Sequence, residues 1–351
     1  MSEESFKQLI SGKSRGVMAS VARGMLHCLS MPYSGVMCLR NAAFDIGLKK
    51  DTRVAVPVIS IGNLTTGGTG KTPIVATVVK LLQELGQRPG IVSRGYRADA
   101  SGENDEKRVL AQLCPDVSHE QNPDRVAAAQ KLIDTASVTA IVLDDAFQHR
   151  RIHRDLNIVL IDATNPFGYG HLLPRGLLRE PLSGLKRADV VLITRADSAS
   201  ENTLSEIAAT VIEQNPSLAQ KIFRVSFRPT GLLSNAGARP LSHVEDKPVT
   251  VMTAIGNPGA FVNTCRQIGA DVVTSMFFPD HHHYTEADLQ SARQHAEAAG
   301  APLILTTLKD LVKIPDANDD ICAVQIATAF ESEKAQQLFR DHLAAAVNEK
   351  I

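Results

Sequence analysis

Residues 54–86, VAVPVISIGNLTTGGTGKTPIVATVVKLLQELG, decide how the N-terminal half of this chain folds. The apolar run over residues 54–61 has the composition of a buried strand. A loop rich in glycine and threonine follows over residues 63–70. From Lys71 onward the apolar residues recur at helical spacing, and Gly86 supplies a helix end signal. The stretch therefore predicts a strand, a glycine loop and a helix in direct succession.

The loop has the features of a phosphate-binding P-loop. Its glycines let backbone N–H groups point inward, and the helix that follows offers the positive end of its dipole. Lys71 is placed to reach the β- and γ-phosphates, and the hydroxyl of Thr72 to ligate Mg²⁺. The usual P-loop pattern has glycine where this chain has Thr65. The residues expected to hold a nucleotide are Thr66, Gly67, Gly68, Thr69, Gly70, Lys71 and Thr72.

Length and composition bound the remaining choices. The chain has 351 residues, which is enough for two domains with separate cores. The formal net charge is −1 and Trp is absent, so neither a basic footprint nor base stacking indicates nucleic acid. Five scattered cysteines without a CxxC pair favour a reducing compartment and no structural zinc.

The N-terminal segment has an amphipathic pattern. One helical face over residues 14–30 is apolar, and Pro32 is expected to interrupt the helix. A spanning helix needs about 20 predominantly apolar residues, and Arg23, His27 and Arg40 break up this run. Two interpretations stay open: a helix that lies in a membrane interface, or an ordinary helix packed on the domain. The apolar face consists of Val17, Met18, Val21, Met25, Leu26 and Leu29.

Polar residues follow several predicted strands. Residues 88–92 form a strand pattern that ends before Arg94, where ligand contacts occur in open α/β sheets. Residues 138–143 form another, and it ends in Asp144 and Asp145, the position of Mg²⁺-holding carboxylates downstream of a P-loop. The acidic loop over residues 98–107 suits either a metal or base site or only a helix N-terminus, and its composition favours the latter.

The C-terminal half predicts a second α/β unit. Strands expected at residues 156–161 and 188–193 complete the first sheet, and the long loop 163–181 carries Arg175 and Arg179, which suit an anionic ligand. Two short strands at 222–227 and 231–233 indicate a boundary. The second pattern has strands at 249–255, 271–278, 303–306 and 321–326 and helices at 260–268 and 332–347.

Three consecutive histidines, residues 281–283, follow a strand of this second pattern. Successive side chains of an extended segment point to alternating sides, so they rarely converge on one ion. We expect one of them instead to face a cleft between the domains.

Taken together, the motifs resemble those of tetraacyldisaccharide 4′-kinases, the lipid A 4′-kinases of Gram-negative bacteria. The resemblance extends from the N-terminal apolar segment to about Lys313. The motifs, in order, are GNLTTGGTGKTP (62–73), SRGY (93–96), the pair at 105–106, DDAFQHRR (144–151), LPRGLLREP (173–181), FPDHHHY (278–284) and residues 307–313.

The resemblance implies an α/β fold with two α/β/α sandwich domains joined by a short two-stranded linker. The N-terminal domain would be a P-loop NTPase domain with a parallel sheet, and the site would lie between the domains. The implied boundaries are a membrane-interface helical segment at 1–50, a kinase domain at 51–228, a linker at 229–247 and a smaller α/β domain at 248–351.

The implied activity is transfer of the γ-phosphate of ATP to the 4′-hydroxyl of a tetraacyldisaccharide 1-phosphate, with ATP and Mg²⁺ as cofactors. The protein would act as a peripheral enzyme on the cytoplasmic face of the inner membrane, without nucleic acid and as a monomer. A P-loop GTPase or ATPase switch of the metal-chaperone kind, with the histidines as its metal site, is the alternative.

Residue by residue, the resemblance assigns catalysis to Lys71, Asp105 as the base that activates the sugar hydroxyl, and His281 as its partner. Metal association falls to Thr72, Asp144, Asp145 and Glu106. Substrate contacts fall to Arg94, Gln148, His149, Arg179 and Glu180. Three motifs depart from the family: GENDEK stands for GDEP, DDAFQH for DDGFQH and GLLRE for GPLRE. The first departure makes Glu103 a competitor of Asp105.

Overall fold

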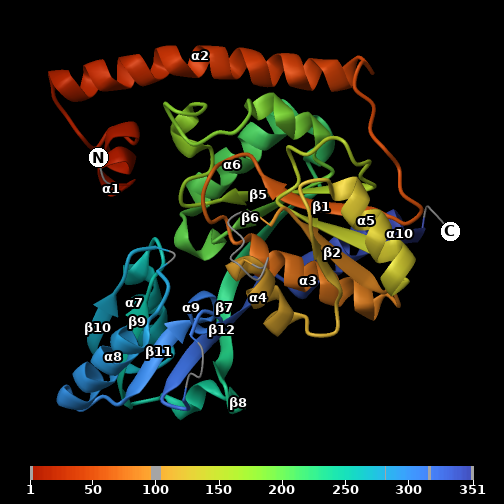
Figure 1. Ribbon diagram of the computed structural model, residues 1–351. Helices are drawn as coiled ribbons and strands as arrows, with labels where there is room; N and C mark the ends of the chain where they lie inside the picture. Colours follow the sequence, from red (N-terminus) through yellow and green to blue (C-terminus); the bar gives the residue numbers. More distant parts are fainter. Residues whose placement is uncertain (1–2, 96–103, 281, 315–317, 349–351) are drawn as a thin grey trace. The chain divides into compact units, whose positions relative to one another are not determined.

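The computed structural model describes residues 3–95, 104–280, 282–314 and 318–348 (Figure 1). The chain forms two compact units. The first unit contains described residues up to Gly95, residues 116–226, and the C-terminal part from Ala329. The second contains described residues 104–115 and 227–328. Each unit is an α/β structure, as the sequence predicts.

The first unit is built on a parallel sheet with the strand order β7-β6-β5-β1-β4-β2-β3. Its central strands are apolar and buried along their whole length, which suits a parallel sheet covered by helices. The strands are β1 (Val58–Asn63), β2 (Pro89–Ser93), β3 (His119–Gln121), β4 (Ala140–Asp144), β5 (Leu156–Asp162), β6 (Val190–Thr194) and β7 (Ile222–Ser234). The helices are α1 (Glu3–Ile10), α2 (Val17–Asp45), α3 (Lys71–Glu84), α5 (Arg125–Ala136), α6 (Glu201–Gln214) and α10 (Glu333–Asn348).

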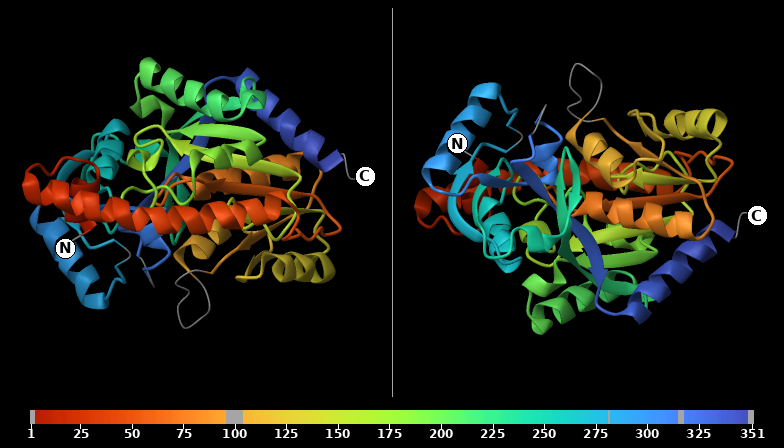
Figure 2. Two further views of the ribbon diagram at one scale, coloured as in Figure 1. Left: turned by 90° about the horizontal axis from the view of Figure 1, so that it is seen from above. Right: turned by 90° about the horizontal axis from the view of Figure 1, so that it is seen from below.

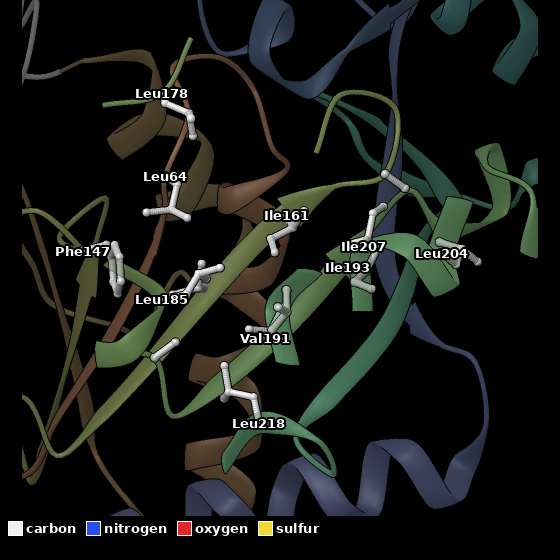
Figure 3. Close-up of a cluster of buried hydrophobic side chains, with 14 residues drawn as sticks. Leu64, Phe147, Ile161, Leu178, Leu185, Val191, Ile193, Leu204, Ile207 and Leu218 are labelled. Atoms are coloured by element: carbon white, nitrogen blue, oxygen red, sulfur yellow. The ribbon is translucent and has the colours of Figure 1, made fainter. Parts of the chain in front are cut away.

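One core cluster of this unit joins the sheet to the loops that carry the site (Figure 3). Val191 and Ile193 of β6 pack with Leu204 and Ile207 of α6. The same cluster includes Leu64 at the base of the P-loop. Burial of these side chains, about 1.5–3 kcal/mol each, therefore stabilises the strand ends from which the P-loop emerges.

The second unit has a parallel sheet in the order β10-β9-β11-β12, with a short antiparallel pair between β7 and β8. The strands are β8 (Gly237–Arg239), β9 (Pro248–Thr253), β10 (Asp271–Phe277), β11 (Leu303–Thr307) and β12 (Ile321–Phe330). The helices are α4 (Asp105–Leu113), α7 (Pro258–Gln267), α8 (Glu286–Ala298) and α9 (Leu308–Leu311). Short 3₁₀ segments in the chain are η1 (Gly168–Gly170), η2 (Leu182–Arg187), η3 (Ala196–Ser198), η4 (Pro216–Leu218) and η5 (Leu241–His243).

The compact units differ from the predicted boundaries at two places. Helix α4 lies in the second unit, because Val109 packs in a core cluster with Met252 and Leu308. Helix α10 lies in the first unit, where the buried Phe339 makes an edge contact with Phe223 of β7, at 5.8 Å between ring centroids. Both assignments depend on packing between segments far apart in the sequence.

The boundary region is one strand, not two. β7 runs without a break through Pro229. That residue falls between residues 222–224, which pair with β6, and residues 232–234, which pair with β8. The missing N–H of Pro229 therefore costs neither of these ladders a hydrogen bond.

The prediction that Pro32 interrupts the N-terminal helix is wrong. α2 is a single helix of 29 residues that passes through Pro32 on the outside of the first unit (Figures 1 and 2). Ser30 and Tyr33 on either side hydrogen-bond to the carbonyl oxygens of Leu172 and Arg179 and hold the helix in place. No helix within the described ranges is long and apolar enough to cross a bilayer.

Candidate active site

The P-loop joins the buried strand β1 to the N-terminus of α3. Gly70 has φ +81° and precedes the helix in the left-handed conformation, and Gly67 has φ +119°. A side chain at either position would be strained. The backbone conformation that the glycines were predicted to allow is therefore present, and it leads directly into Lys71 and the half-buried Thr72.

Neighbouring loops hold the P-loop in place. The N–H of Thr66 donates to the carbonyl of Leu177 at 2.7 Å. The hydroxyl of Thr194 donates to the carbonyl of Thr69 at 3.0 Å, and the guanidinium of Arg195 donates to that of Gly68 at 2.9 Å. Thr194 and Arg195, which directly follow the strand expected at residues 188–193, thus bind the loop that would hold phosphate.

Lys71 and Asp145 face each other at the end of the sheet. The Nζ of Lys71 lies 3.7 Å from Oδ1 of Asp145 and 3.5 Å from Oδ1 of Asn63. Arg179 donates from Nη1 to both oxygens of Asp145 at 2.9 Å. Asp145 has φ +50°, which turns the chain sharply after β4, while Asp144 at the strand end is buried. The structure thus collects two cations and two carboxylates beside the P-loop.

The charges of this group act on one another. Burial alone would raise the pKa of Asp145, but Lys71 and Arg179 outweigh it and hold the pKa of that carboxyl below its ordinary value. Asp145 is therefore ionised at neutral pH. A cation–carboxylate–cation arrangement can exchange its carboxylate for phosphate oxygens when an anionic ligand enters.

A hydrogen-bonded network continues from this group toward α2. Gln148 donates from Nε2 to Oε1 of Glu180 and to the carbonyl of Asn63, both at 2.9 Å. Oε2 of Glu180 accepts from Arg187 at 2.6 Å and from Asn41 of α2 at 3.1 Å. Glu180 is 0% exposed. Its two oxygens are both engaged, which favours a positioning role over direct contact with a substrate.

His149 and Arg94 occupy different environments. Burial lowers the pKa of His149 to about 4, and the nearby cation Arg125 adds to the shift. His149 is therefore neutral at pH 7 and can act as a hydrogen-bonding group. Arg94 is exposed just beyond β2. Burial also lowers the pKa of Arg125. The charge of Arg94 adds to this lowering, whereas the charges of Asp145 and Asp144 oppose it.

Sequence reasoning missed two contributors to this region. Arg125 is buried at the start of α5, and the only signal was its place after a capping residue, Asp124. Helix α1 was not predicted separately, yet Phe6 and Lys7 line a cavity of about 350 Å³ beside the P-loop, together with Thr65–Thr69 and Tyr169. Contacts of this kind have no local sequence signature, because they join segments far apart in the chain.

Arg175, predicted to suit an anionic ligand, lies elsewhere. Its Nη1 donates to the carbonyl oxygen of Ile10 at 2.8 Å, so that it ties the long loop to α1. Of the two arginines predicted from this loop, Arg179 joins the carboxylates described above.

The remaining predicted residues belong to the second unit. Asp105 and Glu106 form the first turn of α4, where Asn104 accepts from the N–H of Lys107 at 2.9 Å and caps the helix. The loop over 98–107 is thus in part a helix N-terminus. His281 and Glu103 lie outside the described residues. His282, which follows His281, bonds Asp288 at 3.0 Å and stacks on Phe278.

The motif over residues 307–313 forms a tightly bonded turn in the second unit. Oδ2 of the fully buried Asp310 accepts from the hydroxyls of Thr253 and Thr307 at 2.8 and 2.7 Å. Lys313 lies 3.2 Å from the other oxygen, with its ammonium 5.7 Å from the ring centre of Tyr284. This buried pair fixes the turn beneath the core that also receives α4.

The donor atoms beside the P-loop fit Mg²⁺. The ion prefers oxygen ligands and uses one or two carboxylates together with substrate phosphates. The hydroxyl of Thr72 and the carboxylates of Asp144 and Asp145 offer that chemistry. Within the described parts of the chain, no group of three or more His, Cys, Asp or Glu residues is arranged to hold a metal ion.

The fold and this site define a P-loop nucleotide-binding protein of the α/β class. The family model described as tetraacyldisaccharide-1-P 4′-kinase matches residues 22–344. A tetraacyldisaccharide 4′-kinase of Anaeromyxobacter sp. (strain Fw109-5) is 38% identical over 88% of this chain and 86% of its own length. That of Bdellovibrio bacteriovorus is 33% identical over 91% and 97%. The chain belongs to the tetraacyldisaccharide 4′-kinase family.

A solved structure agrees with this membership. The crystal structure of LpxK from Aquifex aeolicus, an "apo" form in complex with ATP, aligns with a TM-score of 0.75 and 28% identity. The alignment covers 93% of this chain and 99% of that one. The similarity therefore extends over both units.

Proposed function

We propose that this chain transfers the γ-phosphate of ATP to the 4′-hydroxyl of a tetraacyldisaccharide 1-phosphate, a step of lipid A biosynthesis. The observation that carries the proposal is the position of Lys71 at the start of α3, 3.7 Å from Asp145. Lys71 directly follows the glycine loop, and the chain belongs to this kinase family. The metal-chaperone alternative finds no comparable support.

The residues of the first unit would act mainly by positioning and charge. Phosphoryl transfer needs alignment and charge stabilisation more than covalent chemistry. Lys71 and Arg179 would neutralise the transferring group, and the P-loop N–H groups would hold the phosphates. Mg²⁺, when bound by Thr72, Asp144 and Asp145, with Glu106 as a further candidate, would withdraw charge from the phosphate oxygens.

The residues that would contact the acceptor are Arg94, Gln148, His149 and Arg179, with Glu180 as their support. Arg179 donates to Oε1 of Gln148 at 3.5 Å and also bonds Asp145, while Gln148 bonds Glu180, so that one network would serve both the phosphate and the sugar. His149 would take part as a neutral hydrogen-bonding group, because its pKa of about 4 lies far below neutral pH.

Asp105 would accept the hydroxyl proton, with His281 as its partner. In support, Asp105 lies in a capped first turn of α4, which Val109 anchors in the core of the second unit. An ionised carboxylate is also favoured at a helix N-terminus. A carboxylate held on a fixed helix turn can act as a general base without prior rearrangement.

Replacing Asp105 by alanine should lower kcat about 10²–10⁴-fold, the usual contribution of a general base. The measurement is transfer of labelled γ-phosphate from ATP to a tetraacyldisaccharide 1-phosphate in detergent micelles. The Kd for ATP should stay unchanged, because the P-loop lies in the other unit. Asp116→Ala, a change of the same kind outside the proposed site, is the control.

Transfer that survives in the Asp105→Ala protein would move the base to another residue, with Glu103 tested first. If the wild-type protein hydrolyses GTP and transfers nothing to the acceptor, the kinase proposal is refuted in favour of the switch. Selective binding of zinc or nickel in stoichiometric amounts would point the same way.

Helix α2 would seat the enzyme on the cytoplasmic face of the inner membrane as a peripheral protein. Its polar side chains face the first unit: Tyr33, Arg40 and Asn41 donate to Arg179, Gln148 and Glu180, respectively. Its large apolar side chains point away from the unit. They include Val17, Met18, Val21, Met25, Leu29, Val36 and Leu39, with exposed fractions from 55% at Val21 to 84% at Met18.

This orientation favours the interfacial interpretation over an ordinary packed helix. A helix that only packs on its domain buries its apolar face, whereas α2 docks by its polar face. A contiguous exposed apolar stripe marks a binding surface. The acylated acceptor supplies a reason for a membrane position, because its chains reside in the bilayer.

Changing Val21, Met25 and Leu29 together to serine should reduce partition of the protein into vesicles about 100-fold. Each side chain of this size contributes about 1.5–3 kcal/mol when fully buried, and less when partly buried in an interface. Flotation with phosphatidylcholine vesicles measures the effect. Activity on acceptor in micelles of a neutral detergent should change much less.

The matched control alters three exposed apolar residues elsewhere, Val273, Phe277 and Leu338, to serine. It should partition like the wild type. Equal losses in both variants, or no loss in the α2 variant, would show that this helix is not the membrane contact.

A further inference from the structure

A cationic pocket lies in the first unit where α2 ends. The cavity of about 350 Å³ is lined by Arg40 and Phe44 of α2, by Lys49 and Lys50 beyond it, and by residues 149–151 after β4. Five of the seven lining residues are lysine or arginine, and none is acidic. The family assignments above give this collection of charges no role beyond His149.

Acidic neighbours offset only part of the charge. Arg150 donates to Asp45 at 2.7 Å, and Arg151 lies 3.4 Å from Asp124. Arg40 donates to the neutral carbonyl of Gln148. Lys49 and Lys50 have no acidic partner in the described part of the chain.

The pocket carries an excess of positive charge. Burial lowers the pKa of Arg40 despite the opposing effect of Glu180, and Arg150 and Arg187 add to the lowering. An anion placed among these groups would relieve the repulsion. Arg150 also lies over the ring of Phe44, 4.9 Å from its centre, which holds the guanidinium at the wall of the cavity.

Exposed apolar residues stand next to the pocket's lining residues in the sequence. Leu39, Ile46 and Leu48 flank its lining residues in the sequence, and all three are more than two-thirds exposed. Leu39 continues the exposed stripe of α2. A water-soluble anion would make no favourable contact with these apolar side chains, whereas a phospholipid presents a phosphate and acyl chains together.

We propose that this pocket binds the phosphate headgroup of an anionic membrane phospholipid, while Leu39, Ile46 and Leu48 enter the acyl region. The inference rests on the proposed docking of α2 to the membrane and names the lipid chemistry that this docking recognises. The site would orient the enzyme on the bilayer, because it adds a charged contact at one end of an otherwise apolar helix.

The test compares the full chain with the double variant Lys49→Ala/Lys50→Ala. Flotation is measured with vesicles of phosphatidylcholine alone and with vesicles that also contain phosphatidylglycerol. The wild type should prefer the anionic vesicles, and the variant should lose about 10-fold or more of that preference. Binding to pure phosphatidylcholine should stay the same. The control Lys80→Ala/Lys186→Ala removes the same charge from two exposed sites and should retain the preference.

A second arm separates membrane lipid from the acceptor's own phosphate. In neutral detergent micelles, the KM for tetraacyldisaccharide 1-phosphate should be equal in the wild type and the Lys49/Lys50 variant. A raised KM with an intact preference for anionic vesicles would assign the pocket to the acceptor and overturn the proposal. A wild type indifferent to phosphatidylglycerol, or a variant that keeps the preference, would overturn it as well. Loss of the preference in a protein without kinase activity would uphold the pocket while refuting the proposed function.

Discussion

Replacing Lys71 by alanine should lower kcat for phosphoryl transfer by about 10²–10³-fold or more, the usual cost of removing one preorganised group that stabilises transition-state charge. Lys71 begins α3 directly after the left-handed Gly70, so its backbone position is set by the P-loop itself. Its side chain is only 11% exposed, and water cannot replace the ammonium without entering this nearly closed position. The measurement is single-turnover transfer at saturating ATP.

The same substitution has a second, electrostatic consequence. Lys71 is the first of the charges that hold the pKa of Asp145 below its ordinary value against the effect of burial. Without it, the pKa of Asp145 should rise, and activity that depends on the ionised carboxylate should be lost at a higher pH as the solution is acidified. The acid limb of the pH–rate profile should move upward in the variant.

Lys80 supplies the control, because it is an exposed lysine on the same helix. Lys80→Ala should leave kcat and the pH profile unchanged. If Lys71→Ala retains more than about a tenth of the wild-type kcat, the charge at this position contributes less than one transition-state contact, and the proposed role is wrong.

Replacing Glu180 by alanine should lower the free energy of unfolding of the protein by about 3–5 kcal/mol. Glu180 is 0% exposed and accepts from Arg187 at 2.6 Å and from Gln148 at 2.9 Å. Its removal leaves the largely buried guanidinium of Arg187 without a counter-charge and frees the Asn41 contact that fastens α2. Loss of one partner from a buried ion pair costs far more than the pair contributes.

Urea denaturation followed by circular dichroism measures this effect. Glu201→Ala is the comparison, because Glu201 forms an ion pair with Arg224 but is 77% exposed, and such pairs contribute about 0–1 kcal/mol. Glu180→Gln removes the charge but keeps one oxygen that can accept a hydrogen bond, so it should fall between the two. Equal stability of the Glu180→Ala and Glu201→Ala proteins would contradict the structural role assigned here.

The positions of most strands and of the glycine loop could be read from the sequence because they depend on local chemistry. The run before the P-loop became β1, and the positive φ angles of Gly67 and Gly70 follow from a loop that only glycine tolerates well. The strand ending in Asp144 is β4. The catalytic assignments of Asp105 and His281 remain predictions that came with the family resemblance.

Tertiary packing decided what local patterns could not. The periodicity of α2 showed one apolar face, but only its hydrogen bonds to residues of the first unit revealed that the polar face docks. The helix also continues through Pro32, since contacts on either side support it. Arg125 lies near Asp144 and Asp145 because folding brings the start of α5 to the end of β4.

By itself the sequence determined the α/β class, the P-loop and the family, because each depends on residue types at fixed spacing along the chain. The tertiary structure decided that α4 belongs to the second unit and α10 to the first. It also decided that Glu180 is buried and positions its neighbours, and that α2 exposes its apolar face. The physical reason is that burial and ion pairing depend on which distant segments meet. A periodic pattern indicates which residues share one face of a helix or strand. It does not indicate which distant segment packs against that face, or whether any does.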